Sequence, residues 1–122
     1  MTKKILIVDD SESIRSLLKY NLETGGYETV VAKDGLEALK IIENNDDFNL
    51  LLTDLHMPNM NGLELIEKVR KYDRLKFLPI LFLTTETNID MKQRAKNAGA
   101  TGWIVKPFQS EKLIKTIRKV LR

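Results

Sequence analysis

Polar side chains follow directly after four apolar runs of the chain. The runs at 4–8, 50–53, 80–83 and 104–105 end, respectively, in Asp9-Asp10, Asp54, Thr84 and Lys106. If these runs are parallel strands of one sheet, their carboxyl ends meet at one edge and bring three carboxylates, a hydroxyl and an ammonium together. Such a set of groups is suited to hold a divalent cation and a phosphoryl group.

The three aspartates predict a site for a hard metal ion. Carboxylates placed side by side repel one another unless a cation lies among them. All the available ligands are oxygen atoms, which favours Mg²⁺ and argues against zinc. A structural alternative is that Asp10, or Ser11 beside it, caps the helix that follows. Because one capping residue is enough, Asp9 and Asp54 exceed what a cap needs.

Asp54 is the candidate nucleophile of this site. The turn-rich segment 55–62 follows it and is expected to leave its carboxylate exposed. An exposed aspartate beside a metal ion can attack phosphorus and form an aspartyl phosphate. Lys106, a point charge on a flexible stem, and the Thr84 hydroxyl are the candidates to contact the other phosphoryl oxygens.

Five strand–helix pairs are predicted from the hydrophobic pattern. Apolar or β-branched runs predict strands at 4–8, 29–32, 50–53, 80–83 and 102–105. Apolar residues at helical spacing follow the strands, and on the first two helices they are Ile14, Leu17, Leu18, Leu22, Leu36, Leu39 and Ile42. Capping patterns predict helix starts at Asp34 and Asn61, a fourth helix covers about 88–97, and the last helix reaches Leu121.

This alternation predicts an α/β fold. Strands that are apolar throughout belong to a parallel sheet with helices on both faces. Five strands are too few for an eight-stranded barrel, so we expect an open, doubly wound, five-stranded parallel sheet of order 2-1-3-4-5 with five helices, a flavodoxin-like arrangement. In this order the strands that end in Asp9-Asp10 and Asp54 are neighbours, at the point where ligands bind. No linker or repeat interrupts the chain, and we expect a single domain over 1–122.

Size and charge exclude several classes of protein. The 122 residues contain no cysteine, which excludes disulfides and thiolate metal sites. The apolar run after the basic start is too short for a signal peptide, and no run reaches membrane-spanning length, so we expect a cytoplasmic protein. The net charge of +3 comes from interleaved acids and bases rather than from the clustered basic face that nucleic-acid binding needs.

Four segments together resemble the receiver domain of response regulators, and the resemblance extends over the full length of the chain. The segments are Ile7-Val8-Asp9-Asp10, Thr53 to Pro58 with Asn61-Gly62, Leu83-Thr84, and Gly99-Ala100 to Lys106-Pro107-Phe108. The resemblance implies that Asp54 is the phosphoacceptor and receives its phosphoryl group from a phosphohistidine of a sensor histidine kinase. It implies that Asp10, Asp54 and the backbone carbonyl of His56 ligate Mg²⁺, with Asp9 acting nearby through water. It also implies that Thr84 and Lys106 contact the phosphoryl group and that the bond before Pro107 is cis.

Other side chains are expected to modulate this site. In the family, the side chains two residues after the acceptor and two after the threonine tune how fast the aspartyl phosphate hydrolyses, and here they are His56 and Glu86. The alternative for His56 is a solvent-facing ring of no consequence. Trp103 stands where the family usually has a Tyr or Phe that changes rotamer. Trp103 is therefore either a static residue that anchors a partner or a switch whose rotamer change is restricted. The resemblance also points to an output surface, whose candidates are Lys92, Lys96, Trp103, Lys112 and Lys115, although ordinary surface lysines would look the same.

These features predict a two-component response regulator that is phosphorylated on Asp54 in a Mg²⁺-dependent reaction and then changes its binding partner. We expect it to assist its own phosphorylation and dephosphorylation but not to be an enzyme otherwise, and to act as a monomer in chemotaxis on an output protein such as the flagellar motor switch. The chain ends just after its last helix, which favours a stand-alone protein over a receiver of a larger regulator or a phosphorelay intermediate. A Mg²⁺-dependent phosphatase would place its acceptor after the first strand with a second acid two residues on, and a flavodoxin-like electron carrier would have a phosphate-binding loop where Asp9-Asp10 stand.

Overall fold

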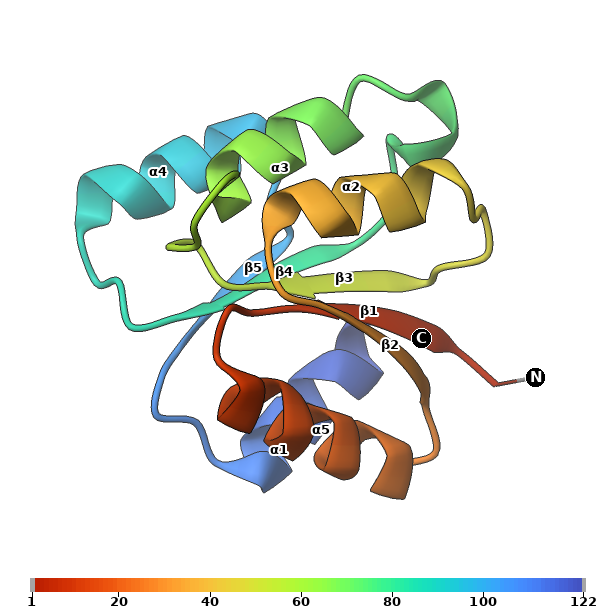
Figure 1. The fold of residues 1–122 in the computed structure, drawn as a ribbon. Helices are drawn as coiled ribbons and strands as arrows, with labels where there is room; N and C mark the ends of the chain where they lie inside the picture. Colours follow the sequence, from red (N-terminus) through yellow and green to blue (C-terminus); the bar gives the residue numbers. More distant parts are fainter. Residues whose placement is uncertain (1, 122) are drawn as a thin grey trace.

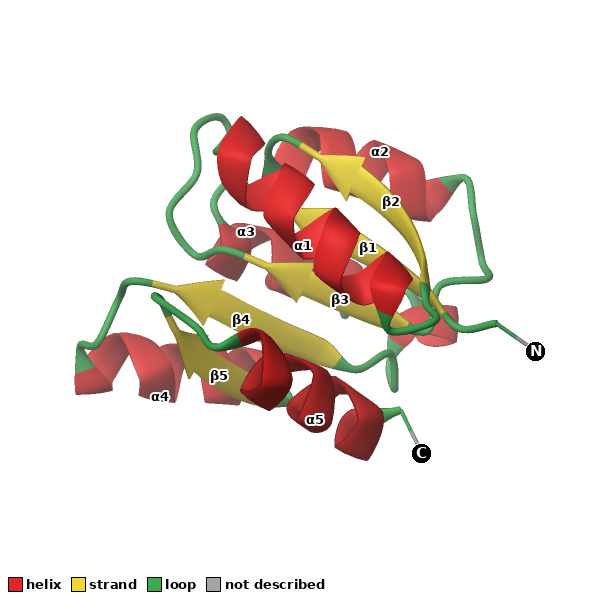
Figure 2. Ribbon diagram, turned by 90° about the horizontal axis from the view of Figure 1, so that it is seen from below, coloured by secondary structure: helices red, strands yellow, loops and turns green. Residues whose placement is uncertain are grey.

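The computed structural model describes residues 2–121, which form an open sheet of five parallel strands (Figure 1). The strands are β1 Lys4–Val8, β2 Glu28–Ala32, β3 Leu50–Thr53, β4 Ile80–Thr84 and β5 Gly102–Val105. Their order is β2-β1-β3-β4-β5, as the sequence predicts. The arrowheads of β2, β3, β4 and β5 point the same way in Figure 2, and β1 pairs in parallel with β2 and β3, so the loops that follow the strands lie at a common edge.

Helices cover both faces of this sheet. They are α1 Glu12–Thr24, α2 Gly35–Glu43, α3 Gly62–Val69, α4 Ile89–Ala98 and α5 Ser110–Val120. One face carries α2, α3 and α4, and the other carries α1 and α5 (Figure 1). A short 3₁₀ helix over Asp73–Leu75 was not predicted, because a single turn has no periodicity to detect. None of the helices within residues 2–121 is both long and apolar enough to cross a membrane.

Adjacent residues on each strand belong to opposite cores, since side chains alternate along a strand. Leu6 and Val8 pack beneath α2 and α3, whereas Ile5 and Ile7 pack against α1 and α5. Two of the apolar residues at helical spacing lie outside the core. Leu17 is 46% exposed and Leu36 is 43% exposed, because the buried stripe of α1 follows Leu18 and Leu22, and that of α2 follows Gly35, Ala38 and Ile42.

Side-chain caps fix where the helices begin. Ser11, and not Asp10, caps α1 by accepting the Ile14 N–H at 3.3 Å, so Asp10 is free for the site. Asn61 and Glu64 form the predicted capping box of α3. At α2 only half of the predicted box exists: Asp34 accepts the Glu37 N–H, but the Glu37 carboxylate accepts the N–H of Lys33 instead.

The start of α3 packs closely against the end of β3. The Gly62 N–H donates to the Leu55 carbonyl at 2.8 Å, which folds the intervening loop back on itself. A Cβ at Gly62 would collide with the Asp54 carbonyl and would lie 2.6 Å from the Phe82 ring. Only glycine therefore allows α3 to begin directly behind Asp54.

Candidate functional site

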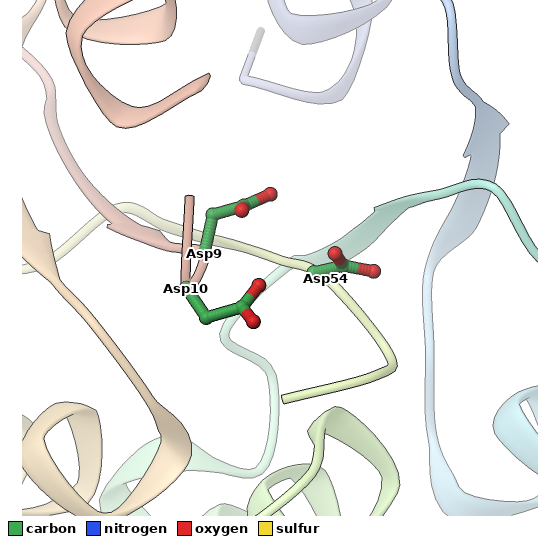
Figure 3. Close-up of side chains that lie close together, drawn as sticks. All are labelled: Asp9, Asp10 and Asp54. Atoms are coloured by element: carbon green, nitrogen blue, oxygen red, sulfur yellow. The ribbon is translucent and has the colours of Figure 1, made fainter. Parts of the chain in front are cut away.

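Three carboxylates converge where β1 and β3 end. Asp9 and Asp10 follow β1, Asp54 follows β3, and the last residues of these strands, Val8 and Thr53, are register partners. One oxygen from each of the three carboxylates lies within 4.8 Å of the others (Figure 3). The strand-end pattern of the sequence thus brought together the side chains it was expected to bring together, because parallel neighbours end at the same edge.

The ammonium of Lys106 lies between two of these carboxylates. It is 2.6 Å from Asp9 Oδ2 and 3.1 Å from Asp54 Oδ2, and the Lys106 side chain is only 12% exposed. Burial lowers the pKa of Lys106, but the hydrogen bonds to Asp9 and Asp54 outweigh it and raise this pKa above its ordinary value of 10.5. Lys106 is therefore a charged partner of the acidic site.

The three carboxylates differ in how much of their coordinating capacity is already used. Asp9 is 2% exposed, and its oxygens accept the Ser11 N–H and the Lys106 ammonium. The Asp54 side chain is only 11% exposed, so the exposure predicted from the loop after it is wrong. One of its oxygens accepts the Leu55 N–H at 2.6 Å, and the other accepts the Lys106 ammonium. Asp10 is exposed. This donor set consists of oxygens, is open to solvent at Asp10, and fits a hydrated Mg²⁺.

Thr84 lies at the end of β4 and is fully buried. Its Oγ1 accepts the Glu86 N–H at 3.3 Å, which leaves the hydroxyl proton free to donate elsewhere. Within residues 2–121 no hydrogen bond joins Thr84 to Asp54. Directly after β5, the Lys106 N–H donates to the Thr84 carbonyl at 2.8 Å, and the Lys106–Pro107 bond that follows is cis.

Glu86 connects the other residues that the sequence singled out. Its carboxylate contacts His56 Nε2 at 2.8 Å and accepts the Asn88 N–H that precedes α4 at 3.0 Å. The His56 ring, and next the Asn88 N–H, lower the pKa of Glu86 below its ordinary value. The Glu86 carbonyl accepts the Trp103 indole N–H at 3.2 Å. Glu86 therefore links the loop after β3, the start of α4 and the aromatic residue on β5.

Trp103 is half-buried and packs on the sheet. Its ring centroid lies 5.6 Å from that of Phe82, its register partner on β4. Thr84 follows Phe82 by two residues, so the side chains of Thr84 and Trp103 lie on the same face of the sheet.

The proposed output lysines do not form one group. Lys92, Lys96 and Trp103 line a cavity of about 360 Å³ between α4 and β5. Trp103 and Lys112 line a second cavity of about 430 Å³ on the other side of β5. Lys115 instead lines a cavity between α1 and α5.

Sequence reasoning missed two residues that support the site. The Arg15 guanidinium donates to the Asp9 carbonyl at 2.8 Å. Asn59 has a left-handed backbone, with φ of 68°, and its amide donates to Asp34 at 2.7 Å. The turn composition after Asp54 was the available signal for Asn59, whereas nothing local connected it to Asp34.

Comparison with known proteins identifies the family. The model of the response regulator receiver domain matches residues 5–118. Chemotaxis protein CheY1 of Helicobacter pylori is 42% identical over 119 residues, which are 97% of this chain and 96% of that protein. Chemotaxis protein CheY of Pseudomonas aeruginosa is 41% identical over 96% of this chain and 94% of its own length.

Solved structures agree with this assignment. Chemotaxis protein CheY4 of Vibrio cholerae superposes with a TM-score of 0.94 at 46% identity, covering 99% of this chain and all of the other. A CheY-like receiver domain protein of Methanospirillum hungatei gives a TM-score of 0.93 at 36% identity, over 99% of this chain and 94% of the other. The family model, the relatives and the solved structures agree, and the chain belongs to the response regulator receiver domain family.

Proposed function

We propose that this chain is a two-component response regulator that accepts a phosphoryl group on Asp54 from a sensor histidine kinase. The observation that carries the proposal is the joint placement of Asp54, Asp10 and Lys106 at one edge of the sheet. In this family the phosphoryl donor is a phosphohistidine and the target is a partner protein. We also propose that residues 1–122 form a single domain.

Each side chain has a distinct part in the transfer. Asp54 Oδ2 leaves Lys106 and attacks phosphorus, an O–P bond forms, and the P–N bond to the donor imidazole breaks with its electron pair staying on nitrogen. Lys106 then pairs with a phosphoryl oxygen, and the Thr84 hydroxyl donates to another. Asp10, Asp54 and the His56 carbonyl would hold Mg²⁺, which supplies positive charge to the phosphoryl oxygens. Hydrolysis by water returns Asp54 and inorganic phosphate.

Metal removal tests this proposal. With a small phosphodonor and Mg²⁺, we expect intact mass spectrometry to show one added phosphoryl group per chain. With excess chelator the adduct should disappear, because the carboxylates then repel the incoming phosphoryl group. Mg²⁺ at ten times its Kd should also stabilise the fold by about 1.4 kcal/mol. Full phosphorylation in chelator, or no adduct with Mg²⁺, would contradict the proposal.

The His56–Glu86 contact is proposed to set the lifetime of the aspartyl phosphate. The pair links the loop that follows Asp54 to the β4–α4 loop, and the His56 side chain is 60% exposed against 24% for Glu86. Replacing both residues with alanine should open the path of water to the phosphoryl group and shorten the phosphate half-life several-fold. Phosphate release after donor removal measures it, and an unchanged half-life would rule the role out.

Trp103 is proposed to report phosphorylation. Its indole donates to the Glu86 carbonyl, and the Glu86 N–H donates to Thr84, so a movement of Thr84 toward the phosphoryl group should reach the indole. We expect its fluorescence to change in parallel with the Asp54 adduct. Unchanged emission in a fully phosphorylated sample would support the static reading of this aromatic residue.

The partner surface is proposed to centre on α4 and β5. Lys92, Lys96 and Trp103 surround the cavity there, and Ile89 beside it is 79% exposed. A basic rim around an aromatic residue suits an acidic segment with an apolar anchor. The named relatives act in chemotaxis, which favours the flagellar motor switch as the partner. A receiver of a larger regulator is the alternative, since the Bacillus subtilis regulatory protein PhoP is 39% identical over half of its own length.

A further inference from the structure

The β2–α2 loop and the β3–α3 loop are joined by hydrogen bonds at the edge of the sheet that carries the acidic site. Asn59, in the loop between β3 and α3, donates its amide to Asp34 Oδ2 at 2.7 Å. The Gly35 N–H donates to the Met60 carbonyl at 3.1 Å, and a Cβ on Gly35 would lie only 2.5 Å from that oxygen. The two loops are therefore in close contact through both a side chain and the backbone.

Asp34 performs two tasks with one carboxylate. Its Oδ1 accepts the Glu37 N–H at 2.8 Å and so caps α2, while its Oδ2 accepts the Asn59 amide. Its exposed fraction is 4%. Asn59 has a left-handed backbone, which asparagine adopts more readily than other non-glycine residues. Its hydrogen bond to the buried Asp34 fixes the direction of its side chain.

This contact lies next to the aspartates of the site. Strand β1 is the common neighbour of β2 and β3, so the loops that follow β2 and β3 flank Asp9 and Asp10. Both of these loops lead to helices on the α2–α4 face (Figure 1). His56 belongs to the loop that Asn59 anchors. The Gly62 N–H donates to the Leu55 carbonyl and so joins the two ends of this loop.

We propose that Asp34 and Asn59 are positioning residues, whose contact holds the loop after β3 in place and thereby sets the affinity of the acidic site for Mg²⁺. This inference rests on the proposed function, because it takes the His56 carbonyl as a metal ligand. Neither residue is one of the proposed metal ligands. Residues that orient metal ligands commonly change metal affinity by about 10- to 100-fold when they are replaced.

Mg²⁺ titration calorimetry of the full chain tests the proposal. Asp34→Ser keeps a cap for α2 but loses the oxygen that Asn59 needs, and Asn59→Gly keeps the left-handed backbone but loses the donor. Each variant should bind Mg²⁺ about tenfold more weakly. The double variant should bind no more weakly than either single one, since both remove the same contact. Exchanging the residues, with Asp34→Asn and Asn59→Asp together, restores a donor–acceptor pair and should restore affinity.

Arg74→Ala is the matched control. Arg74 donates to the Ile42 carbonyl at 2.6 Å, so its loss loosens α2 at the end far from the site. Its Mg²⁺ affinity should equal that of the wild type. Wild-type affinity in both single variants, or an equal loss in Arg74→Ala, would overturn the positioning role. Absence of Mg²⁺ binding by the wild type would instead contradict the proposed metal site itself. If Asp34→Ser does not fold, Asn59→Gly decides alone.

Discussion

Asp54→Asn is expected to abolish phosphorylation of this chain. The amide keeps the shape of the carboxylate but is not a nucleophile toward phosphorus, and it removes one of the negative charges that would hold Mg²⁺. The wild type should gain one phosphoryl group from a small phosphodonor with Mg²⁺, and the variant none over the same time. Intact mass spectrometry of the two proteins side by side gives the result.

Asp47→Asn is the control for this experiment. Asp47 is an exposed aspartate, 62% accessible, that pairs with Lys4 far from the acidic site. Its replacement should leave the adduct unchanged. A circular dichroism spectrum and a melting curve like those of the wild type would show that Asp54→Asn is folded. An adduct on Asp54→Asn would mean that another residue is the acceptor.

Lys106→Met is expected to destabilise the metal-free protein and to make Mg²⁺ a stronger stabiliser. Methionine fills a similar volume but leaves Asp9 and Asp54 without their shared cation. Removing one partner of a buried ion pair costs about 3–5 kcal/mol, and we expect about 3 kcal/mol because the site opens to solvent at Asp10. A Tm lower by about 10 °C in chelator would be the corresponding shift.

The same substitution should tighten Mg²⁺ binding. In the wild type the ammonium and the metal ion compete for one cluster of carboxylates and repel each other, and the variant removes that repulsion. The Mg²⁺-dependent rise in Tm should therefore be larger in Lys106→Met, although phosphorylation should be much slower. Lys19→Met loses an exposed ion pair with Glu23 and a 3.4 Å hydrogen bond to the Thr29 hydroxyl, both outside the acidic site, and should change neither property. An unchanged melting curve in chelator would contradict the structural role of Lys106.

The pH dependence of this effect has a definite sign. Because the fold raises the pKa of Lys106 above 10.5, the stability it contributes is fully present below that pH. This contribution is lost as the pH rises through the higher pKa of the folded state. The difference in unfolding free energy between wild type and Lys106→Met should be constant near neutral pH and should shrink in strong alkali.

The sequence alone determined the architecture of the sheet and the place of the acidic site. Apolar strands that alternate with amphipathic helices require a parallel sheet covered on both faces, and such a sheet brings the ends of β1, β3, β4 and β5 to one edge. The pattern therefore placed Asp9, Asp10, Asp54 and Lys106 together before any coordinates were known. Helical spacing did not show that Leu17 and Leu36 are exposed, because two adjacent apolar residues, or a residue in the first turn, leave the direction of the buried face ambiguous.

Other features were decided only by the tertiary structure. The sequence could not say which of Asp9 and Asp10 is buried, that Trp103 bonds to the Glu86 carbonyl, or that Lys115 lies apart from the other lysines. It marked Asp34 as a helix cap but not as the partner of Asn59, 25 residues away along the chain. Periodicity and capping depend on neighbours within a few residues, whereas these contacts depend on how separate loops pack against each other once the sheet has formed.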